Sequence, residues 1–86
     1  MSDAIDYRRP PAGSKLELYV KPSCPYCAQA REHYDAAGIA YGVHDAQHDP
    51  AARDAMFALS GGDPTVPAIV VDGAYVRSGW GEPPRG

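Results

Sequence analysis

Residues 21–27 read KPSCPYC and contain both cysteines of the chain, Cys24 and Cys27. They follow an apolar run that alternates like a strand and precede a run with the pattern of a helix. A thiol at the start of a helix is stabilised as the thiolate, because unpaired backbone N–H groups and the helix dipole favour negative charge there. A thiol one turn later can then attack a mixed disulfide formed at the first. The stretch therefore predicts a redox-active dithiol, with Cys24 as the nucleophile, Cys27 as the resolving thiol and Lys21 as a nearby positive charge.

The residues around this stretch predict a β-α-β unit. Residues 15–20 alternate apolar side chains and predict a central strand. Pro25 suits the first position of a helix, where its missing N–H costs no hydrogen bond, and Gly38 suits the position after a helix that ends near Ala37. Residues 39–44 alternate again and predict an edge strand. Because a helix joins the two strands, we expect them to be parallel, with a right-handed crossover.

The second half of the chain predicts a helix and a hairpin. Asp49-Pro50 is an N-cap followed by a helix-starting proline, and it predicts a second helix through Leu59. Residues 67–71 are an apolar, β-branched run, Asp72-Gly73 is a strong two-residue hairpin signal, and residues 74–77 return antiparallel. The order βαβαββ predicts an α/β domain with a four-stranded mixed sheet and flanking helices.

Size and composition predict one small domain. The chain has 86 residues, 44% of them hydrophobic, and a net charge of −3, which gives no reason to expect a nucleic acid or an anionic membrane as partner. We expect residues 1–14 to be a flexible leader that packs only through Ile5 or Tyr7, residues 15–78 to form the domain, and residues 79–86 to be a Gly/Pro-rich tail. The leader lacks the apolar core of a signal peptide, so we expect a cytoplasmic protein, and a lone CxxC in that compartment indicates redox chemistry or metal binding.

The cysteine motif and two further signals together resemble one family. The stretch KPSCPYC at residues 21–27 is similar to the active-site loop of dithiol glutaredoxins, Thr65-Val66-Pro67 is similar to their TVP turn, and Asp72-Gly73 falls at their hairpin. The resemblance covers Leu16 to about Ser78. It implies a thioredoxin-like sheet with strand order 2-1-3-4 and a cis peptide bond before Pro67.

The same resemblance implies a site for glutathione. The tripeptide would pair with the backbone of Val66 like an added short strand. Lys21 and Arg53 would meet its glycyl carboxylate, and Tyr26 would pack against it. The full set of binding candidates is Lys21, Tyr26, Arg53, Thr65, Val66, Pro67 and Ser78. The alternatives are structural: solvated charges at Lys21 and Arg53, a tyrosine that only covers the helix end, and a plain loop at residues 65–66.

The end of the chain departs from the family pattern. Glutaredoxins usually continue with a Gly-Gly pair and an Asp that hold the γ-glutamyl end of glutathione, and then a last helix. Here residues 77–82 read RSGWGE, which resembles instead the final segment of glutaredoxin-like redoxins reduced by thioredoxin reductase. Ser78 or Glu82 would have to replace the missing groups. Trp80 either anchors a partner or folds back to complete the core. A second departure is Asp63-Pro64, where many glutaredoxins carry a basic residue.

These features predict a glutaredoxin-like thiol–disulfide oxidoreductase that reduces protein disulfides or glutathione mixed disulfides. We expect a monomer with no tightly bound cofactor and with glutathione as co-substrate. Zinc requires about four ligands, and the three histidines do not stand at ligand spacing from the two cysteines. One alternative is a redoxin reduced by thioredoxin reductase, for instance as electron donor to a ribonucleotide reductase. Another is a binding module, either a dimer that bridges an iron–sulfur cluster with glutathione or a domain that only docks a partner.

Overall fold

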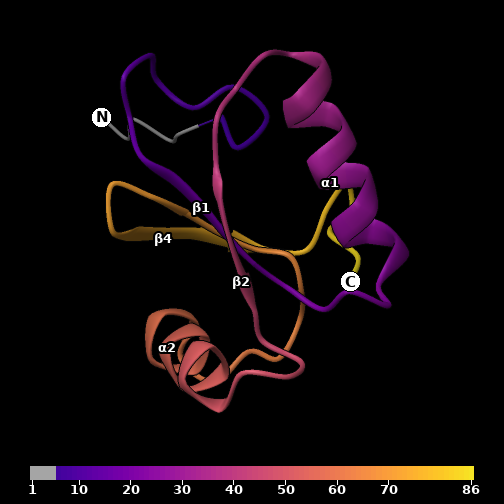
Figure 1. Ribbon diagram of the computed structural model, residues 1–86, viewed down its shortest axis with the longest axis vertical. Coiled ribbons are helices and arrows are strands. Elements are labelled where there is room, and N and C mark those ends of the chain that lie inside the picture. The colour runs from indigo at the N-terminus through magenta and orange to yellow at the C-terminus, as the bar shows by residue number, and fades with distance from the viewer. Residues whose placement is uncertain (1–5) are drawn as a thin grey trace.

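The computed structural model describes residues 6–86. Four strands form one sheet, and two helices pack against it (Figure 1). The elements follow the predicted order βαβαββ. Their bounds are β1 Leu16–Val20, α1 Pro25–Ala36, β2 Gly42–Asp45, α2 Pro50–Ser60, β3 Ala68–Val71 and β4 Ala74–Ser78.

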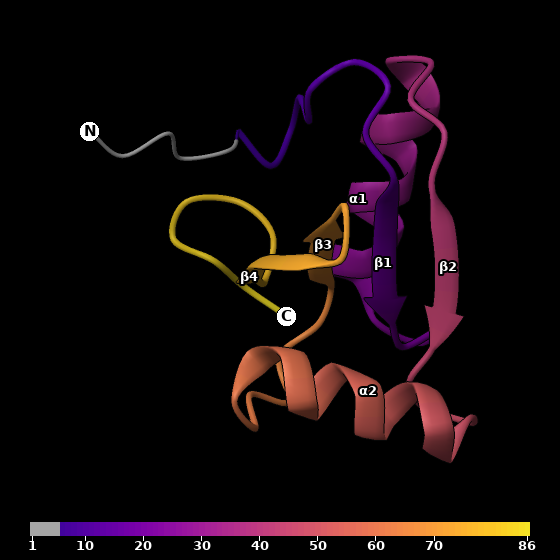
Figure 2. The same cartoon turned by 90° about the vertical axis from the view of Figure 1, so that its left-hand side faces the viewer.

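The strands lie in the order β2-β1-β3-β4, which confirms the predicted topology. β1 pairs in parallel with β2 and antiparallel with β3, and β3 pairs antiparallel with β4. β1 and β3 are therefore central, and Figure 2 shows β2 along the outer side of β1. This arrangement brings the segments that follow β1 and precede β3 to the same end of the sheet.

The core forms on both faces of the sheet, with α1 and α2 on opposite sides (Figures 1 and 2). β3 is buried along its whole length, as expected for a central strand covered on two faces. Ala30 and Tyr34 of α1 and Ala52 and Met56 of α2 supply the buried stripes of the two helices. The sheet therefore holds the N-terminus of α1 in a fixed position beside the end of β1.

The hairpin between β3 and β4 also fixes the start of β1. Asp72 and Gly73 both have positive φ, 52° and 78°, as a two-residue type I′ turn requires. The Asp72 carboxylate accepts a hydrogen bond from the Lys15 amide at 2.7 Å, and the Asp72 amide donates to the Lys15 carbonyl at 2.8 Å. The Asp72-Gly73 signal thus sets both the hairpin and the register at the beginning of β1.

The second strand begins later in the chain than the predicted range of residues 39–44. Gly38 adopts φ 70° after the end of α1, and the Ile39 amide donates to the Tyr34 carbonyl at 2.9 Å. Residues 37–39 therefore complete the C-terminal turn of the helix, in the manner of a Schellman motif. β2 begins only at Gly42 and extends one residue further, to Asp45. Ile39 packs against the core from the connection and not from a strand.

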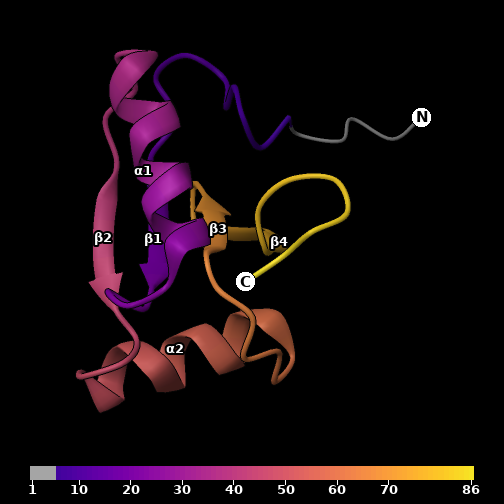
Figure 3. The same ribbon diagram turned by 90° about the vertical axis from the view of Figure 1, so that its right-hand side faces the viewer.

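The two ends of the described chain pack together. Tyr7 and Trp80 are 7% and 8% exposed, and their rings meet edge to face at 5.1 Å. Trp80 also contacts the ring of Tyr34 in α1 at 5.6 Å, so it folds back onto the core. Ile5 lies outside the described residues. Within residues 6–86 no helix follows β4, and Figure 3 shows the final segment as a loop beside β4.

Neither described helix is long and apolar enough to cross a membrane.

Candidate active site

Cys24 occupies the N-cap of α1, as the sequence predicts. The chain leaves β1 at Val20 and turns, with the Cys24 amide donating to the Lys21 carbonyl at 2.9 Å. Cys24 has extended φ and ψ of −86° and 121°, and Pro25 takes the first helical position. The thiol is therefore held at the point where the loop becomes helix.

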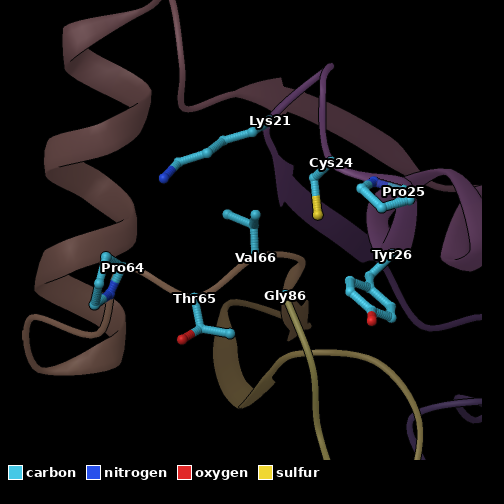
Figure 4. A pocket seen from close by; sticks show the side chains of 8 residues that line it. All are labelled: Lys21, Cys24, Pro25, Tyr26, Pro64, Thr65, Val66 and Gly86. Carbon is cyan, nitrogen blue, oxygen red and sulfur yellow. The ribbon is translucent and has the colours of Figure 1, made fainter.

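Cys24 stands at the positive end of the α1 dipole, with its side chain lining the cleft. The first turn of α1 carries no acidic side chain, so the positive end of the helix dipole is not offset there. The Cys24 side chain makes no capping hydrogen bond and is half-buried, which leaves the sulfur available to a substrate. In Figure 4 the sulfur points into the space in front of Val66, with the Lys21 side chain on the same side.

Cys27 lies one turn further along α1 and is only 3% exposed. Burial raises the pKa of the Cys27 thiol to about 12, and its contact with Cys24 acts in the same direction, while a backbone hydrogen bond at Lys21 acts against it. Both cysteines are in the free thiol form. The pair therefore consists of an accessible sulfur and a protonated, covered one that stands behind it.

The segment that precedes β3 lies across from Cys24 and forms the second wall of the space that the Cys24 sulfur faces. The Asp63 carboxylate accepts a hydrogen bond from the Thr65 amide at 2.8 Å, which holds the turn and lowers the pKa of that carboxyl. The Val66–Pro67 peptide bond is cis. Within residues 6–86, neither the amide nor the carbonyl of Val66 makes a hydrogen bond. Its backbone is therefore a free donor and acceptor pair beside Cys24.

The two walls enclose a cleft of about 440 Å³, which is within the range of small-molecule sites. Of the residues predicted for the site, the structure brings five to this cleft: Lys21, Cys24, Tyr26, Thr65 and Val66. Cys27 lies behind Cys24 in the core. The cleft therefore joins the thiol loop to the TVP turn, as their places in the topology require.

Three of the predicted binding residues do not line the cleft. Arg53 lies on the exposed face of α2, since the buried stripe of that helix passes through its neighbour Ala52. Pro67 is fully buried. Ser78 pairs with Ala68 in the sheet, and its hydroxyl hydrogen-bonds the Tyr75 hydroxyl at 2.6 Å. Glu82 is also engaged elsewhere, by Arg77 at 2.9 Å.

Sequence reasoning did not assign to the site three residues that line the cleft: Pro25, Pro64 and Gly86. Pro25 and Pro64 flank predicted site residues, so proximity in sequence could have found them. Gly86 is different, because only the folding of the final segment brings it to Val66. No local signal in the sequence indicates this contact.

The described part of the chain contains no cluster of three or more His, Cys, Asp or Glu side chains that could hold a metal ion. All three histidines have other contacts, and His33 Nε2 lies 2.8 Å from the Arg8 carbonyl oxygen. His44 stacks on Tyr19 at 4.6 Å and lies 3.0 Å from Glu17, and His48 lies 2.8 Å from Asp45.

The family model described as Glutaredoxin matches residues 16–76, from the start of β1 into β4. The chain belongs to the glutaredoxin family. The match includes the thiol loop and the Val66 wall, which are the two sides of the cleft.

Individual glutaredoxins show similarity over the same part. Putative glutaredoxin-C12 of Arabidopsis thaliana is 33% identical over an alignment of 64 residues that covers 71% of this chain and 62% of that protein. Glutaredoxin 3 of Escherichia coli K12 is 30% identical over 63 residues, 73% of this chain and 75% of that protein. The chain thus spans less than two thirds of the length of the Arabidopsis relative.

Solved structures support the same fold. The thioredoxin-like protein BC3987 superimposes with a TM-score of 0.65 at 32% identity, over 74% of this chain and 81% of that one. A buckwheat glutaredoxin in complex with glutathione gives a TM-score of 0.64 at 22% identity, over 76% of this chain and 61% of that one. This glutaredoxin therefore has the thioredoxin-like sheet that its motifs imply.

Proposed function

We propose that this glutaredoxin is a thiol–disulfide oxidoreductase that reduces protein disulfides or glutathione mixed disulfides. The observation that carries the proposal is the arrangement of the two thiols. Cys24 is half-exposed at the N-cap of α1 and faces a cleft, whereas Cys27 is buried one turn behind it. Family membership supports the same chemistry.

The reaction proceeds by two exchanges. The Cys24 thiolate attacks one sulfur of the substrate disulfide, a bond forms between the two sulfurs, and the other substrate sulfur leaves as a thiolate that takes up a proton. Cys27 then loses its proton and attacks the Cys24 sulfur, which releases the second substrate thiol. The substrate gains two electrons and two protons, and the protein is left with a Cys24–Cys27 disulfide.

Glutathione is the reductant that the cleft supports best. The free amide and carbonyl of Val66 suit a short peptide that adds as a strand, and Lys21 offers a positive charge for a carboxylate at the same opening. A buckwheat glutaredoxin of the same fold has been crystallised with glutathione. Two glutathione molecules would reduce the Cys24–Cys27 disulfide and leave as glutathione disulfide. We place this chemistry in the cytoplasm, where the glutathione pool is reducing.

A second candidate is reduction by thioredoxin reductase. The observation that favours it is the absence of Arg53 and Ser78 from the cleft, which leaves fewer groups to hold glutathione. Both candidates use the same two sulfurs and differ only in the source of electrons.

A side-by-side assay tests the proposal. Reduction of a glutathionylated peptide would be followed with glutathione, glutathione reductase and NADPH, and in parallel with thioredoxin reductase and NADPH. We expect turnover in the first system and none with Cys24→Ser. Retained activity in Cys24→Ser would remove Cys24 as nucleophile. Turnover only with thioredoxin reductase would favour the second candidate. A Cys27→Ser variant that still acts on the glutathionylated peptide would indicate that glutathione, not Cys27, resolves the intermediate.

A further inference from the structure

Gly86 lies directly against the backbone of Val66 inside the cleft (Figure 4). A β-carbon added to Gly86 would overlap the Val66 carbonyl oxygen and would come within 2.9 Å of the Val66 nitrogen and 2.7 Å of the Thr65 methyl. Two of these three neighbours are backbone atoms, which cannot rotate away. The fit at this point therefore depends on the absence of a side chain.

The segment that ends at Gly86 is held back on the core by a backbone bridge. The Trp80 amide donates to the Arg85 carbonyl at 2.8 Å, and the Arg85 amide donates to the Trp80 carbonyl at 3.0 Å. Pro84 packs on Gly79 so closely that a β-carbon at Gly79 would lie 2.8 Å from the Pro84 side chain. The loop between residues 80 and 85 is thus closed, and it directs Gly86 to the cleft.

Side chains brace the same loop from β4 and from the N-terminal segment. Arg77 donates to the Glu82 carboxylate and to the Gly81 carbonyl, each at 2.9 Å. The guanidinium lies 4.0 Å from the ring centre of Tyr7, whose hydroxyl donates to the same Glu82 oxygen at 3.3 Å. The loop therefore has a preferred position, although residues 82–86 are themselves exposed.

Gly86 covers the Val66 backbone but makes no hydrogen bond to the Val66 amide or carbonyl. Within residues 6–86 the Val66 amide and carbonyl have no hydrogen-bond partner, even with Gly86 beside them. A peptide that pairs with Val66 as an added strand needs the space that Gly86 fills. The two cannot be present together, and only the peptide would satisfy both polar groups.

We propose that residues 84–86 compete with the substrate backbone for Val66, so that the segment must move away before glutathione or a substrate peptide binds there. The inference rests on the proposed function, because it takes the cleft as the binding site. If the segment covers the site for about two thirds to nine tenths of the time, the apparent dissociation constant is about three- to tenfold weaker than that of the open site.

Gly86→Ala tests the competition directly. The added methyl group cannot fit against the Val66 carbonyl, so the segment is displaced and the cleft opens. Glu82→Ala should also release the segment from the cleft, because it removes the carboxylate that accepts a hydrogen bond from Arg77. Gly42→Ala is the matched control, because a β-carbon there meets only the Glu17 side chain at 3.9 Å, on the far edge strand.

Affinity for S-methylglutathione, which has no disulfide to react, would be measured by titration calorimetry for the four proteins. We expect Gly86→Ala and Glu82→Ala to bind about three- to tenfold more tightly than the wild type, and Gly42→Ala to match the wild type. Equal affinities in all four proteins, or weaker binding by Gly86→Ala, would overturn the inference.

A second readout separates this result from failure of the proposed function. Reduction of insulin disulfides with dithiothreitol reports Cys24 chemistry without glutathione. If the wild type accelerates that reaction and Gly86→Ala binds S-methylglutathione no more tightly, only the competition is wrong. If no variant binds the analogue or reduces insulin, the proposed function fails and the inference fails with it.

Discussion

The two cysteines should differ in reactivity by a large factor that follows from their burial. The raised pKa of Cys27 gives the size of the effect. The ordinary cysteine value is 9.0 and the folded value is about 12. At pH 8, about one thiol in ten is ionised at a pKa of 9, but only about one in ten thousand at a pKa of 12. Because the thiolate is the reacting form, folding should slow alkylation of Cys27 about a thousandfold.

The assay is iodoacetamide modification followed by mass spectrometry on Cys24→Ser and Cys27→Ser proteins. In Cys24→Ser, we expect modification of Cys27 slower than that of free cysteine by somewhat less than the thousandfold of the intact pair, and about tenfold faster for each pH unit from 8 upward. Cys24 contributes less to the shift than burial does, so most of the protection should remain without it. In Cys27→Ser, Cys24 should react readily.

Unfolding in concentrated guanidinium chloride provides the control, because both single-cysteine proteins should then react at the same rate. Folded Cys24→Ser that reacts within about tenfold of free cysteine would refute the buried, resolving role of Cys27. The same shift has a thermodynamic consequence. Since the folded state holds the proton more tightly than the unfolded state, the stabilisation it provides is present below about pH 9 and is lost as the pH rises toward 12.

Three substitutions test the packing that positions the site. Tyr34→Phe removes the buried hydroxyl that donates to the Tyr7 carbonyl, and it should lower the free energy of unfolding by about 1–3 kcal/mol, measured by urea titration; no loss would mean that this bond does not hold the N-terminal segment. Asp49→Ala removes the N-cap acceptor of the Ala51 amide and should cost about 0.5–2 kcal/mol in the same assay, whereas an unchanged midpoint would contradict the capping role. Met56→Ala empties a fully buried site and should cost about 2–5 kcal/mol, seen as a lower melting temperature in calorimetry; a loss under about 1 kcal/mol would show that the site collapses freely.

The sequence predicts the parts of the site that depend on local chemistry. Pro25 at the first helical position and the strand before it place Cys24 at the N-cap without any tertiary information. The Asp72-Gly73 turn sets the hairpin, and parallel pairing of β1 with β2 follows from the helix between them. Together these signals suffice to bring the TVP turn beside the thiol loop.

What the sequence does not predict depends on competition between elements or on contacts distant along the chain. Ile39 and Tyr41 alternate like strand residues, but the amide of Ile39 is taken by the end of α1, so the strand starts later. The sequence places Arg53 in the second helix, but in the structure its side chain does not face the cleft. The burial of Ala52 and Met56 fixes which face of α2 packs on the core and so turns Arg53 outward. The contact of Gly86 with Val66 has no local signature at all.

The final segment links the stability of this small domain to access to its active site. Within the described chain no helix follows β4, and Trp80 packs between Tyr7 and the buried Tyr34 of α1. The residue that completes the core is also the residue whose backbone pairs with Arg85 and so directs Gly86 to the cleft. A change that loosens Trp80 should therefore do two things at once: expose apolar surface and release the Val66 backbone. Glu82→Ala leaves Trp80 in the core, so it should release the Val66 backbone without exposing apolar surface.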